Sequence, residues 1–180
     1  MIETDDRTYI FVPRTASTSL EKAIMESNPT AINTSLDHPP FRNHSYLSAN
    51  PDKRKVAVIR EPTDWLLSMY NSHFGQGSKF RKELPRLDNR TGILTHKDIL
   101  ELWCFIAKRY LHPNECITQM DWIGDSEVIL FEHLPTEFNR MEHLNSSTRK
   151  VNYLTPDAEI LARIIWKVDY QKYNEKKNGG

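Results

Sequence analysis

Glycine is scarce in this chain, and its distribution excludes the most common nucleotide-binding loops. The chain has 180 residues but only 6 glycines, and the first of them is Gly75. A Walker loop needs Gly-x-x-x-x-Gly-Lys-Ser/Thr, and a dinucleotide fingerprint needs Gly-x-Gly-x-x-Gly. Neither pattern can occur before Gly75, where the first strand-to-helix turns are expected. The usual nucleoside-triphosphate and NAD sites are therefore not expected here.

Cysteine is also scarce, and neither sign of charge is in excess. Cys104 and Cys116 match no zinc-ligand spacing and provide no disulfide framework, so we expect two reduced, partly buried thiols. Lys plus Arg and Asp plus Glu both number 24. A general nucleic-acid-binding protein would show a basic excess. We therefore expect no nucleic-acid partner, although a balanced charge still allows one local phosphate site.

Long apolar runs and metal-site spacings are missing as well. No apolar run approaches the roughly 20 residues of a membrane span. The segment 1–14 carries acidic residues where a signal peptide needs basic ones, so we expect a cytoplasmic protein that does not bind a membrane. His112, Glu115 and His133 match none of the metal-site patterns, and we expect no metal.

The remaining pattern is an alternation of short apolar strands with amphipathic helices. The expected strands cover residues 8–13, 55–59 and 127–131, and the expected helices cover 17–27, 62–74, 96–110, 135–144 and a last helix opening at 155. This alternation predicts an α/β fold with a mainly parallel central sheet. We expect one domain over residues 1–175 and a disordered tail over 176–180. Three tryptophans are expected in the core: Trp103, Trp122 and Trp166.

A turn rich in hydroxyl groups joins the first expected strand to the first expected helix. Residues 12–20 read Val-Pro-Arg-Thr-Ala-Ser-Thr-Ser-Leu. A strand–turn–helix directs backbone N–H groups and the positive end of the helix toward an anion. Arg14 adds a fixed positive charge, and four hydroxyl groups could donate further hydrogen bonds: those of Thr15, Ser17, Thr18 and Ser19. The alternative is a helix cap without a ligand, and this segment alone does not separate the two.

A second candidate for anion binding follows the second expected strand. Residues 60–70 read Arg-Glu-Pro-Thr-Asp-Trp-Leu-Leu-Ser-Met-Tyr. Arg60 can hold a phosphate with two parallel hydrogen bonds, and Ser68 lies on the helix that follows. The alternative is that Arg60 pairs with Glu61 or Asp64 and that Ser68 is a hydroxyl on the helix surface.

The two segments together resemble the sulfotransferases that use 3′-phosphoadenosine 5′-phosphosulfate (PAPS), especially the carbohydrate, or Golgi-type, branch. In that family the first loop reads roughly Pro-Lys-Thr-Gly-Gly-Thr-Ser-Leu, and residues 13–20 align with it. The second family motif, Arg-Asp/Glu-Pro-x-x-Arg-x-x-Ser-x-Tyr, is matched by Arg60, Glu61, Pro62, Ser68 and Tyr70. The chain departs from the family at three places: Arg14 replaces the Lys, Ala16 and Ser17 replace the glycines, and Trp65 replaces the internal Arg.

The resemblance implies a fold, a donor and roles for particular residues. The fold would be a three-layer sandwich of the P-loop-like sulfotransferase type, and the donor would be PAPS. The first loop would hold the 5′-phosphosulfate through Arg14, Thr15, Ala16, Ser17, Thr18 and Ser19, whereas Arg60 and Ser68 would hold the 3′-phosphate. Arg14 would also stabilise charge on the leaving phosphate. Arg keeps the charge of Lys but cannot give up a proton.

The resemblance also implies a catalytic base between the two loops. Glycan sulfotransferases often place a His there, and His44 occupies that part of this sequence. Its unperturbed pKa of about 6.5 suits a base near neutral pH. His38 is the nearest rival, and Glu61 is a weaker candidate because its family counterpart mostly orders the start of a helix. The acceptor would be a carbohydrate or small molecule, bound partly by residues 28–50 and 75–94.

Three functions therefore remain open from the sequence. The first is a PAPS-dependent sulfotransferase acting on a hydroxyl or amine. The second is a module that binds PAPS or its product without catalysis, which the substitutions at residues 14, 16 and 17 favour. The third is a P-loop kinase relative that uses ATP and magnesium, against which the missing glycines and Walker lysine argue. The sequence does not indicate the oligomeric state.

Overall fold

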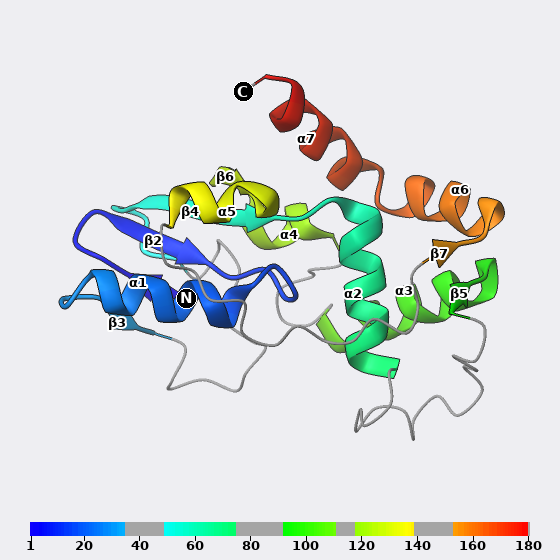
Figure 1. Cartoon of the computed structure of the whole chain (residues 1–180), viewed down its shortest axis with the longest axis horizontal. Helices are drawn as coiled ribbons and strands as arrows, with labels where there is room; N and C mark the ends of the chain where they lie inside the picture. Colours follow the sequence, from blue (N-terminus) through cyan, green and yellow to red (C-terminus); the bar gives the residue numbers. More distant parts are fainter. Residues whose placement is uncertain (35–48, 75–91, 111–117, 139–152, 180) are drawn as a thin grey trace.

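The computed structural model describes residues 1–34, 49–74, 92–110, 118–138 and 153–179. Its centre is a five-stranded sheet with the strand order β3-β1-β2-β4-β6 (Figure 1). Three of these strands are parallel: β2 (Arg7–Ile10), β4 (Arg54–Ile59) and β6 (Glu127–Leu130). The short strands β1 (Ile2–Glu3) and β3 (Ile32–Asn33) add an antiparallel edge. The expected α/β fold with a largely parallel sheet is therefore confirmed.

Helices follow the parallel strands, as the alternation predicted. The helix α1 (Ser17–Ser27) follows β2, and α2 (Pro62–Phe74) follows β4. The remaining helices are α3 (His96–Tyr110), α4 (Gln119–Ile123), α5 (Leu134–Glu137), α6 (Pro156–Ile165) and α7 (Lys167–Asn178). A 3-10 turn, Phe131–His133, joins β6 to α5, and a small parallel sheet pairs β5 (Ile93–Leu94) with β7 (Tyr153–Leu154).

Apolar side chains cover both faces of the central sheet. Along β4, Val56 and Val58 belong to a buried cluster that includes residues of α1, whereas Ala57 and Ile59 belong to a second cluster with residues of α2. This alternation is what a strand buried on both faces requires. Figure 1 shows α2, α3 and α6 together with the small sheet beyond one end of the central sheet. The turns that follow β2 and β4 lie toward that end.

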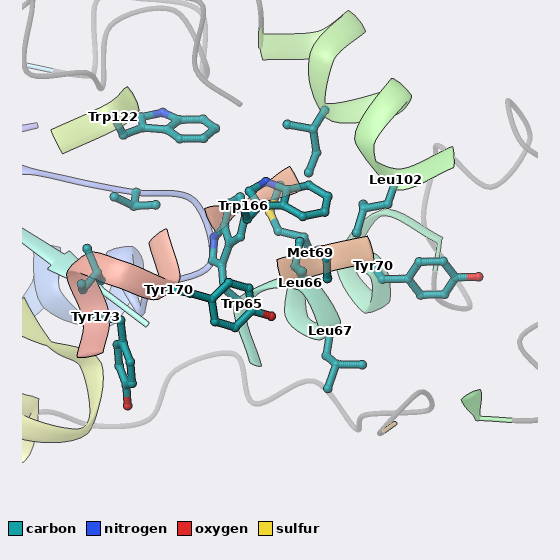
Figure 2. Packing of buried hydrophobic residues seen from close by; sticks show 14 of the residues in the cluster. Trp65, Leu66, Leu67, Met69, Tyr70, Leu102, Trp122, Trp166, Tyr170 and Tyr173 are labelled. Atoms are coloured by element: carbon teal, nitrogen blue, oxygen red, sulfur yellow. The ribbon is translucent and has the colours of Figure 1, made fainter. Parts of the chain in front are cut away.

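The larger cluster contains two of the tryptophans expected in the core. Trp122 and Trp166 are buried, and the rings of Trp65 and Trp122 meet edge to face with centroids 6.3 Å apart (Figure 2). The expectation for Trp103 is wrong, because its side chain is 38% exposed on α3. Cys104, next to it, is an exposed free thiol rather than a partly buried one.

Several boundaries differ from those expected. Of the helix expected over 135–144, residues 139–144 lie outside the described residues; the described part, α5, begins at Leu134 and ends at Glu137, and Phe138 is not helical. The last helix is two helices, which separate at Trp166. The second of them, α7, continues to Asn178, so residues 176–178 of the expected tail are helical here. Among the described residues, no helix is both long and apolar enough to cross a membrane.

Candidate functional site

The turn between β2 and α1 is tightly folded around one carbonyl group. The backbone N–H of Thr15 donates to Val12 O at 3.3 Å, and the Thr15 hydroxyl donates to the same oxygen at 2.8 Å. Thr15 is buried, so its side chain shapes the turn in this structure. Arg14 and Ala16 both have positive φ, 69° and 61°, in the left-handed region that favours glycine. The turn thus has a glycine-type backbone without a glycine.

The first turn of α1 is suited to an anion by its charge and by its cap. Its N-cap, Ala16, makes no side-chain cap hydrogen bond, and the first turn has no acidic residue. In contrast, α4 and α6 begin with the capping residues Thr118 and Thr155 and have acids in their first turns. A helix N-terminus carries about half a positive charge. At α1 neither a side-chain cap nor an acidic side chain offsets this charge.

The predicted hydroxyl residues of α1 differ in exposure. Thr18 is exposed and Ser17 is half-buried, whereas Ser19 is buried. Thr18 and Ser17 can therefore reach a ligand above the turn most directly. The carbonyl of Ala16 accepts the first hydrogen bond of the helix, from Leu20 N at 2.9 Å.

Arg60 lies at the carboxyl end of β4 and is held on both sides of its guanidinium. Its Nη2 lies 3.4 Å from Asp64 Oδ2, and its Cζ lies 4.6 Å from the ring centroid of Phe131. The pairing with Asp64 is one of the two alternatives left open by the sequence. Glu61 caps α2 instead, because its carboxylate accepts from the N–H of Asp64 at 2.7 Å.

The two predicted segments meet at Ser68. Arg14 Nε donates to Ser68 Oγ at 3.4 Å, across 54 residues of sequence. Ser68 is buried, so it is not the surface hydroxyl of the alternative interpretation. The carboxyl ends of neighbouring parallel strands lie at the same edge of a sheet. That topology brings Arg14, after β2, close to a helix that follows β4.

Trp65 ties α2 to the first loop. Its indole N–H donates to Pro13 O at 2.8 Å, and its side chain is fully buried. This is the position at which the resembling family has an Arg. The hydrogen bond shows what the Trp does here: it holds the carbonyl that precedes Arg14.

Two polar residues that the sequence did not single out for the site hold the backbone of Arg60. Gln119 accepts from Arg60 N and donates to Arg60 O, both at 2.9 Å. Asp169 accepts from the N–H groups of Gln119 and Met120 at 2.9 and 3.0 Å. Burial raises the pKa of Asp169 to about 7, while these two N–H bonds oppose the shift. No local pattern marks Gln119, because 59 residues separate it from Arg60.

The proposed base and its rival fall in a part of the chain for which the structure gives no description. His44 and His38 both lie in 35–48, outside the described residues. Most of the expected acceptor region, residues 28–50 and 75–94, also lies outside the described residues. His73 packs against the ring of Phe105 with centroids 4.9 Å apart. Within the described ranges, no group of three or more His, Cys, Asp or Glu side chains could hold a metal ion.

Taken together, the site offers two arginines and a helix N-terminus at one edge of the sheet. Such an arrangement can hold anionic oxygens through charge-assisted hydrogen bonds. Compared with protein-family models, curated proteins and solved structures, the chain has no match in any of the three. The functional argument therefore depends on these residues and their geometry.

Proposed function

We propose that this protein is a sulfotransferase that transfers a sulfo group from PAPS to a hydroxyl or amine acceptor. The observation that carries the proposal is the contact between Arg14 Nε and Ser68 Oγ at 3.4 Å. The sequence resemblance assigns Arg14 to the 5′-phosphosulfate and Ser68 to the 3′-phosphate. One nucleotide can engage both only if the two side chains lie close together. The P-loop-like form of the fold belongs to the same proposal.

The backbone of the first loop supports the proposal independently. Ala16 is left-handed at a position where the resembling family has glycine. A non-glycine residue in this region costs about 1–2 kcal/mol, and such strain is often found at ligand-binding sites. The uncapped start of α1 lies directly after it. Together these features fit a loop that wraps a phosphate with its N–H groups.

The proposed reaction is an in-line transfer. The acceptor oxygen or nitrogen forms a bond to sulfur, and the bond between sulfur and the bridging phosphate oxygen breaks. Adenosine 3′,5′-bisphosphate leaves with that electron pair. Arg14 stabilises the developing charge on the phosphate as a fixed cation and transfers no proton. A base, which the resemblance assigns to His44, accepts the proton of the acceptor.

Asp64 competes with the ligand for Arg60 in this proposal. The Arg60–Asp64 pair is within reach of solvent, since the Asp64 side chain is 45% exposed. A 3′-phosphate brings more charge than one carboxylate and can take over the guanidinium. Asp64 can then turn toward water. The ring of Phe131 keeps the guanidinium in place during this exchange.

The test is a calorimetric titration with adenosine 3′,5′-bisphosphate, run beside ATP with magnesium. We expect micromolar binding of the bisphosphate and weaker binding of ATP. Arg60→Ala should weaken bisphosphate binding by about 10- to 100-fold, because a charge-assisted hydrogen bond contributes about 1.5–3 kcal/mol. Arg60→Lys keeps the charge, loses the two-pronged geometry and should lie between wild type and Arg60→Ala.

The matched control is Arg54→Ala. Arg54 is the first residue of β4, at the opposite end of that strand from Arg60. Its Nη2 pairs with Glu127 Oε2, on the neighbouring strand β6, at 2.6 Å. Its removal should leave nucleotide binding unchanged. If wild type does not bind the bisphosphate, the proposed function is withdrawn. Tighter binding of ATP with magnesium would instead favour a kinase relative.

A nucleotide-binding module without catalysis is the second candidate, and Arg14 is the observation that favours it. Arg14 cannot act as a proton donor, and a transfer that requires one would stop at binding. This candidate predicts bisphosphate binding but no release of bisphosphate from PAPS with any hydroxyl or amine acceptor. Restored transfer in Arg14→Lys would identify the proton donor as the missing element. The cytoplasmic location and the carbohydrate or small-molecule acceptor stay predictions.

A further inference from the structure

The backbone of Arg60 is fixed by a single buried amide. Gln119 contacts both polar groups of the Arg60 backbone, accepting from N and donating to O, each at 2.9 Å. Gln119 is only 1% exposed, so water does not compete for these bonds. A side-chain amide that pairs with both groups resists rotation of either adjoining peptide. It therefore fixes the direction in which the Arg60 side chain leaves the strand end.

Gln119 is in turn fixed by a residue of the C-terminal helix. Asp169, also 1% exposed, accepts from Gln119 N at 2.9 Å and from Met120 N at 3.0 Å. Asp169 lies in the first turn of α7, and Gln119 is the first residue of α4. Three elements distant in the sequence thus meet through four hydrogen bonds behind Arg60. The C-terminal helix determines where Gln119 lies.

The guanidinium itself is restrained at its far end. Phe131 stacks on it at 4.6 Å, and Asp64 contacts it from α2 at 3.4 Å. An arginine that already points in one direction loses less side-chain freedom when it binds an anion. Arg60 is therefore restrained at its backbone and at its charged group, and only the second restraint was suggested by the sequence.

We propose that Gln119 and Asp169 are positioning residues that orient Arg60 for the phosphate of a bound ligand. This inference rests on the proposed function, in which Arg60 binds the 3′-phosphate. Both side chains are buried behind Arg60, so they act through it. Gln119 and Asp169 should therefore raise the binding affinity only of ligands that carry the 3′-phosphate, which Arg60 contacts in the proposed function.

The experiment compares two nucleotides on each variant. Adenosine 3′,5′-bisphosphate carries the 3′-phosphate and adenosine 5′-monophosphate lacks it. The dissociation constant of the monophosphate divided by that of the bisphosphate therefore isolates the contribution of that phosphate. Gln119→Met retains length and apolar volume but removes both bonds to Arg60. Asp169→Asn retains shape but can accept only one of the two N–H groups. Titrations at pH 8 keep Asp169 ionised, because its pKa is about 7.

We expect the ratio to fall by about tenfold in Gln119→Met and several-fold in Asp169→Asn, with monophosphate binding unchanged. Thr155→Ala is the stability control, because it removes the cap of α6 and should not alter the ratio. Unchanged ratios in both variants, with a wild type that prefers the bisphosphate, would overturn this inference alone. A wild type that does not bind the bisphosphate would overturn the inference and the proposed function together.

Discussion

At the scale of single residues, the first loop has an unusual backbone for its composition. Arg14 and Ala16 are both left-handed, although neither is glycine. Thr15 lies between them with its hydroxyl on Val12 O, which closes the turn. The motif correctly placed Arg14 beside the start of a helix, but it could not show this backbone. The hydrogen bonds of Thr15 and Trp65 hold the loop in this conformation.

Replacing Ala16 with glycine should stabilise the protein. Glycine adopts φ near 61° without the steric cost that alanine carries. The free energy gained by removing this strain exceeds the entropy cost of ordering glycine, which is more flexible than alanine in the unfolded chain. We expect Ala16→Gly to raise the free energy of unfolding by about 1 kcal/mol in a urea titration. Ala23→Gly, inside α1, is the matched control and should lower it by about 1 kcal/mol or more. Equal destabilisation by both changes would contradict the left-handed assignment.

The residues of the site were predictable to different degrees. Arg14 and Arg60 are recognisable because each follows an expected strand, and Ser68 because it matches the second motif of the resembling family. The partner of each was not recognisable: Ser68 contacts Arg14, and Gln119 holds Arg60. Such pairings join positions that are far apart in the chain, and a local pattern carries no information about them.

At the scale of elements, the long helices and the three parallel strands were predicted, whereas the shortest elements were not. The bounds of α1, α2 and α3 agree with the expected ranges, because apolar periodicity shows the extent of each helix and Pro62 marks the start of α2. Four strands of two residues each were not expected: β1, β3, β5 and β7. Two residues are too few to show the alternation that identifies a strand. They are strands only because each pairs with a neighbour that is distant in the sequence or joined by a turn: β1 with β2 and β3, and β5 with β7.

Trp65→Phe tests the tie between α2 and the first loop. The substitution keeps an aromatic ring in the core but removes the N–H that donates to Pro13 O. A partly buried carbonyl without its donor costs about 1–3 kcal/mol, so we expect a fall of that size in the free energy of unfolding. The backbone amide signals of residues 14–16 should also shift in NMR spectra. A variant with unchanged stability and unchanged amide signals would show that the bond does not hold the loop.

At the scale of the whole molecule, one buried carboxylate joins the C-terminal helix to the sheet. Asp169, on α7, accepts a hydrogen bond from the backbone N–H of Gln119 on α4. The side chain of Gln119 in turn donates to the carbonyl of Arg60 at the end of β4. The sequence suggested a helix after Thr155 with acids in its first turn, but it did not separate α6 from α7. Because the helix breaks at Trp166, Asp169 lies at the start of a new helix that packs near α4.

This carboxylate should make the stability of the molecule depend on pH. Burial raises the pKa of Asp169 from 3.8 to about 7 in the folded state. Between these values the folded protein retains a proton that the unfolded chain has released. The contribution of Asp169 to the free energy of unfolding therefore falls as pH rises from about 4 to 7, and it is constant above 7.

Urea titrations of wild type and Asp169→Asn at pH 5 and pH 8 measure this effect. Relative to the variant, wild type should lose on the order of 2 kcal/mol between the two pH values. The comparison with the variant removes the contributions of the other titrating groups. A difference between the two proteins that does not change with pH would place the pKa of Asp169 outside this range.

The sequence by itself determined the α/β alternation, the starts of the main helices and the two strand-end arginines. These depend on local chemistry: apolar periodicity, capping residues and proline at the first turn of a helix. Only the tertiary structure decided that Ser68 faces Arg14, that Trp65 holds Pro13, and that Gln119 and Asp169 fix Arg60. The first two contacts arise because β2 and β4 are parallel and bring their carboxyl ends to one edge of the sheet, whereas the last joins β4 to α4 and α4 to α7. Each contact joins residues that are far apart in the sequence, and no local pattern signals such a pair.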